Sequence, residues 1–266
     1  MANYHFNVSV ISRGKGLSLT RRANYISGQT LHDSWNRRTY YRSRNDVQYC
    51  GIFLPDDAPS AFHNLQFLCD KMEQAEVRWD ARTAREVKAS LPNELSPQEN
   101  RWIVQEYIQT NLLNWGVGVI AAIHEGKNDT DPSRNNPHVH MIVSTRAIGP
   151  NGFAVEKDRS LDHGKNIRLW REQWALVQNL AYQRSHLSKR VDHESLEVQG
   201  SPHEPTIHLS RIDWQREKNG EHTVNGDKNR EIHAANNKRR QQYEHQMESP
   251  NYELDLDYED YEDYER

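Results

Sequence analysis

GVGVIAAIH, at residues 116–124, and PHVHMIVST, at residues 137–145, are two apolar, β-branched runs of the kind that forms buried central strands. The polar residues 125–136 join them. Side chains alternate along a strand, so His138 and His140 should point to one face while Val139 and Met141 pack into the core. We therefore expect two strands at the centre of a sheet.

Weaker patterns on either side predict the remaining elements. Phe6, Val8 and Val10 alternate with polar residues over residues 4–10, which predicts a first strand with one buried face. A helix should follow and stop at Gly28, with Ser18 or Thr20 near its start. That helix covers residues 17–25. Further strands are predicted at residues 49–54 and 86–91, and further helices at residues 61–82, 96–115 and 162–188.

The predicted strands and helices alternate over roughly the first 215 residues, which favours an α+β fold, a sheet with helices on one side of it. The start of one helix is marked clearly, because Ser96, Pro97 and Glu99 form a capping-box pattern. After Gly200 the apolar residues thin out, and only a polar helix over residues 228–247 is expected. We predict a main domain over residues 1–215, a polar extension over residues 216–250 and a partly disordered acidic tail over residues 251–266.

The net charge of −4 is unevenly distributed along the 266 residues. Residues 251–266 hold eight acidic residues against one basic residue, a net charge of −7, which leaves +3 on residues 1–250. The tail should be extended by its own repulsion and is expected to be an inert solubilising segment rather than a competitor for a basic surface. The body is mildly basic, so an anionic partner such as DNA is compatible with it.

Two cysteines, Cys50 and Cys69, are too few and too far apart for a disulfide framework or a thiolate zinc site. No apolar run near the N-terminus is long enough for a signal sequence or a membrane span. We expect a protein with reduced thiols in the cytoplasm and no membrane insertion.

The histidines suggest a metal centre. His138 and His140 could bind one ion together, and His124, at the end of the neighbouring predicted strand, could complete a set of three. Three neutral nitrogen ligands leave positions open for a substrate oxygen, whereas a closed structural zinc site would use four ligands, usually with thiolates. His5 is an alternative ligand.

Residues 37–45 (RRTYYRSRN) interleave cations with aromatic rings. This composition suits a surface that follows single-stranded DNA, where arginines meet phosphates and bases stack on tyrosines. The segment is expected to be a loop, and a loop that is merely solvated is the alternative to one that contacts DNA. The candidate DNA contacts in this segment are Arg37, Arg38, Tyr40, Tyr41 and Arg42.

The segment NPHVHMIVSTR, from Asn136, resembles the histidine motif of the HUH endonucleases, and the order of further motifs resembles the MobA/MobL relaxases. Phe6 to Val10, Ser12-Arg13, the turn at Gly14 to Gly16 and Tyr25 match the start of that family. The similarity covers roughly residues 4–210. The later matching segments are SLPNEL (90–95), the strand ending at His124, and VDHESLEVQG (191–200).

The resemblance implies an HUH relaxase-like antiparallel sheet with helices packed on it. It also implies a relaxase that nicks one DNA strand at an origin of transfer. It implies Tyr25 as the nucleophile, a 5′-phosphotyrosyl product, and a divalent ion, Mg²⁺ or Mn²⁺, held by His124, His138 and His140. The implied partners are single-stranded origin DNA, accessory mobilisation proteins and a coupling protein, in the bacterial cytoplasm. Arg13, Arg21 and Arg22 flank the implied nucleophile and are further candidate DNA contacts.

The family often carries Glu-X-Glu before its Ala-Leu-Pro segment, whereas this chain has Glu86-Val87-Lys88. Glu86 is therefore a possible auxiliary residue near the metal, and the second carboxylate is absent. Two other functions are considered: an HUH replication initiator or transposase, in which the tyrosine usually follows the histidine motif, and a DNA-binding repressor, which would need neither Tyr25 nor three histidines.

Overall fold

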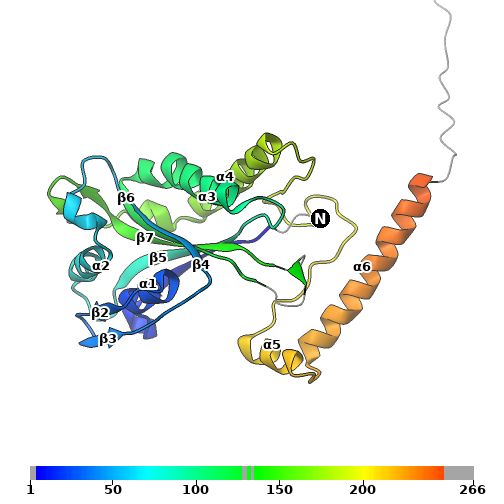
Figure 1. Cartoon of the computed structure of the whole chain (residues 1–266), viewed down its shortest axis with the longest axis horizontal. Helices are drawn as coiled ribbons and strands as arrows, with labels where there is room; N and C mark the ends of the chain where they lie inside the picture. Colours follow the sequence, from blue (N-terminus) through cyan, green and yellow to red (C-terminus); the bar gives the residue numbers. More distant parts are fainter. Residues whose placement is uncertain (1–3, 128–130, 133–134, 249–266) are drawn as a thin grey trace, which may run out of the picture. The chain divides into compact units, whose positions relative to one another are not determined.

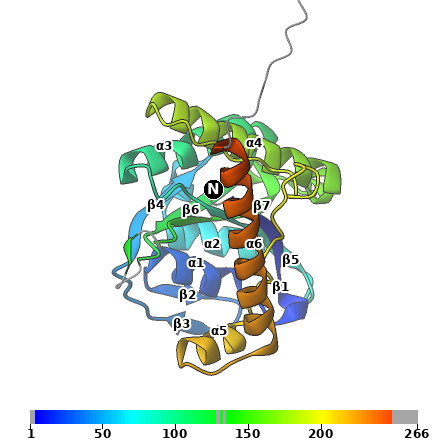
Figure 2. The same ribbon diagram turned by 90° about the vertical axis from the view of Figure 1, so that its right-hand side faces the viewer.

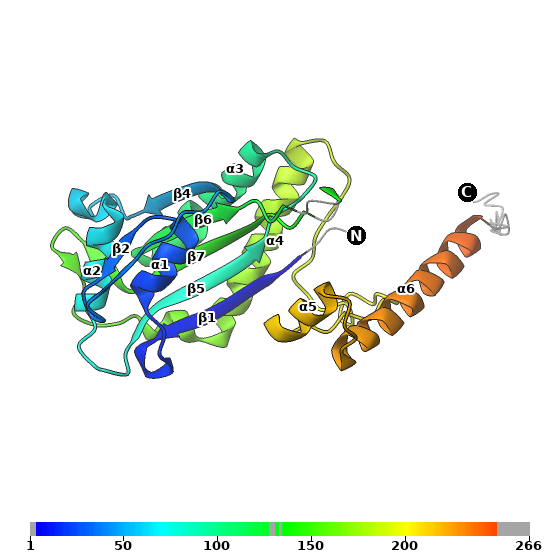
Figure 3. The ribbon, with the colours of Figure 1, turned by 60° about the horizontal axis from the view of Figure 1, so that its bottom comes forward.

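The computed structural model describes residues 4–127, 131–132 and 135–248. Its main sheet is antiparallel, as predicted, with the strand order β1-β5-β7-β6-β4 and a short strand β8 paired to β7 (Figures 1 and 3). The two apolar runs form its central pair, β7 and β6. The strands are β1 (Phe6–Ser12), β4 (Val47–Phe53), β5 (Arg82–Ser90), β6 (Val117–His124), β7 (His138–Gly149) and β8 (Gly152–Phe153).

Helices cover both faces of the sheet, so the expectation of helices on one side is wrong. In β6, Val119 and Ala121 face a core shared with α3 (Pro97–Tyr107) and α4 (Gly164–Arg184). Ile120 faces a second core shared with α1 (Leu19–Ser27) and α2 (Leu65–Gln74), on the opposite side (Figure 1). Every residue of β6 is buried, and a strand covered on both faces has no polar side to expose.

The capping signals acted as expected. Ser18 caps α1 by accepting a hydrogen bond from the Arg21 amide, and Gly28 ends the helix with φ 69°, in the left-handed region that glycine adopts readily. Ser96 accepts from the Glu99 amide at the start of α3. The helix predicted to Trp115 continues beyond α3 as a single π turn and a short 3₁₀ turn.

The helix predicted over residues 61–82 is wrong in its second half. A 3₁₀ turn precedes α2, which ends at Gln74, and Val77 and Trp79 are 86% and 75% exposed. The guanidinium group of Arg13 donates to the carbonyl groups of Glu73, Glu76 and Arg78. These hydrogen bonds cap the end of α2 and turn the chain towards β5. The periodicity of residues 61–82 could not reveal them, because Arg13 is distant in the sequence.

Residues 37–45 were expected to be a loop, and part of that expectation is wrong. Arg38–Tyr40 form strand β3, which pairs with β2 (Leu31–Asp33) in a separate antiparallel ribbon. Asp33 supports the turn between them by accepting hydrogen bonds from the backbone and side-chain nitrogens of Asn36.

The chain divides into two compact units between His193 and Glu194. The second unit contains the helices α5 (Arg211–Lys218) and α6 (Val224–Glu248). Figure 2 shows α6 as a continuous helix, separate from α5. The predicted polar helix is thus confirmed, and α5 was not predicted. The proposed domain boundary at residue 215 stays a prediction, and the tail at residues 251–266 lies outside the described residues.

Candidate active site

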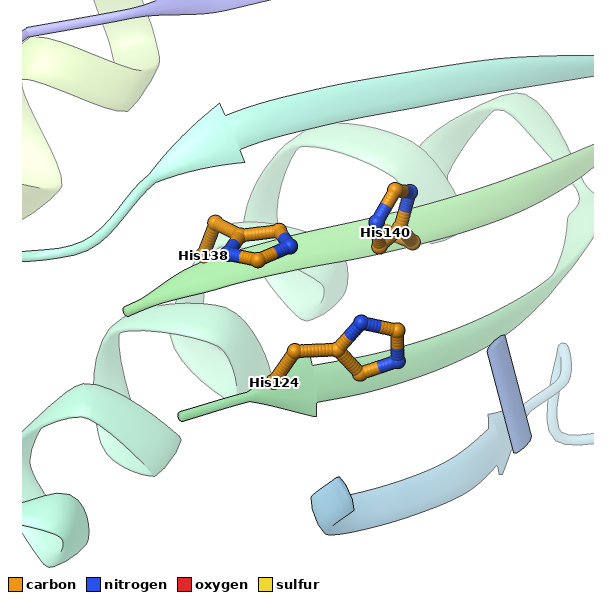
Figure 4. Close-up of side chains that lie close together, drawn as sticks. All are labelled: His124, His138 and His140. Carbon is orange, nitrogen blue, oxygen red and sulfur yellow. The ribbon is translucent and has the colours of Figure 1, made fainter. Parts of the chain in front are cut away.

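Three histidines meet at one end of the sheet (Figure 4). His124 is the last residue of β6 and stands directly opposite His138, the first residue of β7, and His140 follows on the same face. One ring nitrogen from each histidine lies within 4.8 Å of the others. The register of the two central strands therefore creates a cluster that could hold one metal ion.

Each imidazole uses one nitrogen for a hydrogen bond with the protein. His124 donates from Nε2 to the carbonyl oxygen of Ile26 over 2.8 Å, and His138 donates from Nδ1 to that of Asn136 over 2.7 Å. His140 donates from Nδ1 to Oε1 of Glu86 over 2.8 Å. Carbonyl and carboxylate oxygens can only accept here, so these bonds fix the tautomers and leave a lone pair on the other nitrogen of each ring.

The remaining nitrogens fit a metal ion. His124 Nδ1 is buried and has no hydrogen-bond partner in the part of the chain that the structure describes. A buried nitrogen of this kind is costly unless something binds it. Figure 4 shows the three rings turned towards one another, so a cation between them would use the lone pairs.

Burial favours the neutral form of two of the histidines, and hydrogen bonds keep the nearby carboxylate of Glu86 charged. Burial lowers the pKa of His124, and it lowers the pKa of His140 to about 4 although Glu86 acts in the opposite direction. Burial alone would raise the pKa of Glu86, but hydrogen bonds from His140 and Arg22 bring it to about 2. Metal binding requires neutral imidazoles, and the lowered pKa values of His124 and His140 favour that form near neutral pH.

Tyr25 lies beside the histidines. Its ring centroid is 6.0 Å from the ring centroids of both His124 and His140, in edge-to-face arrangements. Tyr25 is half-buried and belongs to the last turn of α1, the helix that packs against the sheet at this end.

Three guanidinium groups surround the Tyr25 ring. Those of Arg22, Arg42 and Arg44 lie 4.6, 4.8 and 4.5 Å from its centroid. Arg22 also forms a bidentate pair with Glu86, the carboxylate that holds His140. The arrangement concentrates positive charge around a hydroxyl-bearing side chain, which suits an anionic substrate.

Sequence reasoning missed Arg44 and Asp46. Arg44 pairs with Asp46 through two nitrogens and donates from Nη1 to the carbonyl oxygen of Tyr25 over 3.2 Å. The sequence did carry a signal for this arginine, because Asp46 follows two residues later. An arginine that pairs with a nearby carboxylate is held in place rather than free in solvent.

The other predicted DNA contacts are distributed unevenly. Arg13 is buried and directs its guanidinium group towards Glu73 and the end of α2, so the structure does not bring it to the cluster. The remaining candidates, Arg21, Arg37, Arg38 and Tyr41, are exposed, and Tyr40 is half-buried. His5, the alternative ligand, is exposed just before β1 and is not one of the three clustered histidines.

No helix in the described ranges combines the length and apolar composition needed to cross a membrane. The sequence matches the model of the MobA/MobL family over residues 17–219. It is 31% identical to a probable mobilization protein MobA of Bifidobacterium longum, over 89% of this chain and 48% of that protein. It is 28% identical to the conjugal transfer protein TraA of Agrobacterium fabrum, over 79% of this chain and 21% of that protein.

The chain thus spans about half the length of the first of these relatives and about a fifth of the second. A solved structure described as the molecular basis of vancomycin resistance transfer in Staphylococcus aureus has a similar fold, with a TM-score of 0.65 and 28% identity. That similarity covers 72% of this chain and 98% of the solved chain.

Proposed function

The chain belongs to the MobA/MobL family, and on that premise we propose that it is a mobilisation relaxase that nicks one DNA strand at an origin of transfer. The observation that carries this proposal is the position of Tyr25, whose ring packs against two of three clustered imidazoles. A repressor has no need of a tyrosine at that point.

The proposed step is a transesterification. The Tyr25 hydroxyl oxygen attacks the scissile phosphorus and forms a 5′-phosphotyrosyl bond, while the bond from phosphorus to the 3′ oxygen breaks. The tyrosine proton leaves and the 3′ oxygen gains one, so the step needs no oxidant or reductant. One high-energy ester replaces another, which preserves the capacity to reseal the strand.

His124, His138 and His140 would hold the divalent ion, Mg²⁺ or Mn²⁺. A bound ion polarises the non-bridging oxygens of the phosphodiester and stabilises the charge that develops there. Glu86 fixes the orientation of His140 and, through its pair with Arg22, holds that guanidinium group near Tyr25. Arg22, Arg42 and Arg44 offer further positive charge to the phosphate, as electrostatic stabilisation requires.

The wider DNA contacts in the proposal are Arg21 and the exposed part of residues 37–42, which precede β4. Arg13 is left out because its guanidinium nitrogens are used within the fold. The proposed partners are single-stranded DNA of the origin, accessory mobilisation proteins and a coupling protein, and the proposed location is the bacterial cytoplasm.

A nicking assay tests the proposal. The purified chain is incubated with a labelled oligonucleotide from the origin of the element that encodes it, with Mg²⁺ or Mn²⁺ and with or without EDTA. The expected product is a shortened strand together with a protein-linked fragment that survives denaturation. Cleavage that continues unchanged in EDTA, or that leaves no covalent species, would count against the mechanism.

A further inference from the structure

Lys88 lies on the same face of the sheet as the three histidines. The register pairs Lys88 of β5 directly with His140 of β7, and residues that face each other in an antiparallel ladder have Cβ atoms about 4.5–5.5 Å apart. Glu86, two residues earlier on that strand, reaches His140 from the same face. The flexible stem of Lys88 can therefore carry its ammonium group into the space beside the cluster.

Lys88 has no ion-pair partner among the residues that the structure describes. Arg22 pairs with Glu86 and Arg44 with Asp46, but half-buried Lys88 has no ion pair or hydrogen bond with any side chain in that part of the chain. A lysine stem can be buried along a surface while its ammonium group stays available for a partner. An anion supplied by a ligand would be such a partner.

The surface beside Lys88 is open on the side away from Tyr25. Asn7 of β1 stands opposite Lys88, and Asn7 and Ser9 on that edge strand are exposed. Helix α1, which carries Tyr25, packs mainly against β6 and β4 and reaches β5 through the pair of Arg22 with Glu86. Figure 3 shows β1 and β5 on one side of β7, and β6 and β4 on the other.

We propose that Lys88 binds a phosphate of the single DNA strand adjacent to the phosphate attacked by Tyr25. The inference rests on the proposed function. Lys88 and Arg42 lie on opposite sides of the histidine cluster, because Arg42 belongs to the segment that leads into β4. A strand that crosses the sheet end at the cluster would meet Arg42 and Arg44 on one side and Lys88 on the other.

Salt-dependent binding tests the proposal. In a Tyr25→Phe background, the affinities of Lys88→Met and Lys88→Arg for an oligothymidylate and for the origin oligonucleotide are measured from low to high salt. Lys165→Met is the matched control, since Lys165 is exposed near the start of α4, on the other face of the sheet. Each phosphate contact on a single strand contributes about 0.7 to the slope of log affinity against log salt.

Lys88→Met should lower that slope by about 0.7, Lys88→Arg should retain it, and Lys165→Met should leave it unchanged. In a second test, a neutral methylphosphonate replaces one linkage beside the nick at a time. At one of these linkages the replacement should weaken binding by the chain that carries Lys88. The same replacement should have no added effect on binding by Lys88→Met. A slope that is unchanged in Lys88→Met, or lowered equally in Lys165→Met, would overturn the proposal. Lys88→Gln repeats the test if Lys88→Met melts at a lower temperature.

Two further readouts separate the causes. The affinity for Mn²⁺ alone, followed by electron paramagnetic resonance, should be the same with Lys88 and with Met at this position, and a gain in metal affinity without a change in DNA slope would show that Lys88 acts on the ion instead. A chain that nicks its origin but shows no Lys88 effect refutes this inference alone. A chain that shows the Lys88 effect but never nicks refutes the proposed function alone.

Discussion

The hydrogen bond from His140 Nδ1 to Glu86 Oε1, 2.8 Å long, joins the candidate metal ligands to the arginines around Tyr25. Glu86 binds Arg22 through both carboxylate oxygens, so one buried side chain orients a ligand and a guanidinium group together. Replacing Glu86 with Ala should lower metal affinity about 10–100-fold, the usual effect of losing such a partner. Glu86→Gln keeps a hydrogen-bond acceptor, so its metal affinity should lie between those of the unchanged chain and Glu86→Ala.

Metal titration followed by nicking at limiting and excess ion measures this effect. Excess metal should restore much of the lost nicking, because the ligands themselves remain. Glu94→Gln is a suitable control, since Glu94 pairs with Lys189 away from the cluster. An equal loss of metal affinity in both variants would contradict the assigned role.

Removal of the Tyr25 hydroxyl should abolish covalent capture of origin DNA while leaving binding nearly intact. Tyr25→Phe keeps the ring that packs between the histidines and the arginines and removes only the nucleophilic oxygen. A denaturing gel detects the protein–DNA species, and Tyr41→Phe, at an 81% exposed position, serves as control. Capture that persists in Tyr25→Phe would place the nucleophile elsewhere.

His138→Ala or His140→Ala should reduce nicking strongly, because a site with two of three ligands binds a divalent ion much more weakly. Chelation of the normal chain should have the same effect. His5→Ala removes an exposed imidazole outside the cluster and should be mild. Calorimetric titration with Mn²⁺ measures the affinity directly, and equal affinities in His5→Ala and His140→Ala would be inconsistent with the site.

Arg44 should act by positioning Tyr25. It contacts the ring, the backbone carbonyl of the same residue and Asp46, so its loss frees the end of α1 to move. Displacement of a reacting group by about 1 Å can cost on the order of 100-fold in rate. Arg44→Ala should therefore lower kcat by about 10–100-fold and affect oligonucleotide affinity much less, and Arg44→Lys, which lacks the planar fork, should not restore the rate.

Arg21→Ala is the control for Arg44, because Arg21 is exposed on the same helix. Single-turnover kinetics at saturating DNA separates the rate from the affinity. If Arg44→Ala raised only the Kd and left the rate unchanged, a purely DNA-binding role would replace the positioning role.

Arg13 should matter for stability rather than for DNA contact. The side chains of Arg13 and Glu73 are only 5% and 4% exposed and their charged groups are 2.5 Å apart. Loss of one partner of a buried pair leaves an uncompensated charge, so Arg13→Met should lower the free energy of unfolding by about 3–5 kcal/mol. Urea denaturation measures the loss, with exposed Arg38→Met as control. Unchanged stability together with weakened DNA binding would favour the contact predicted from sequence.

The sequence identified the elements that carry local signals. Alternation located β1, the apolar runs located β6 and β7, and the caps at Ser18, Gly28 and Ser96 located helix ends, because these features depend on neighbours within a few residues. Order and spacing of motifs were also enough to indicate the family, since they do not depend on coordinates.

Three features depended on contacts between distant residues. The end of α2 is set by Arg13, about 60 positions away in the chain. The second layer of helices was missed because a strand buried on both faces carries no alternation that would reveal two partners. Arg44 could not be assigned to Tyr25 from spacing, because α1 and the segment before β4 meet only in the folded chain.

The sequence by itself determined which residues could do chemistry, since His138 and His140 share a face through the two-residue period of a strand. Only the tertiary structure decided which nitrogen of each imidazole is free to bind a metal ion. The antiparallel register brings His124 opposite His138, and Glu86 and two backbone carbonyls each accept a hydrogen bond from one ring N–H group. The remaining lone pairs converge because hydrogen bonds between separate strands and a helix fix each tautomer, and no pattern along the chain encodes that geometry.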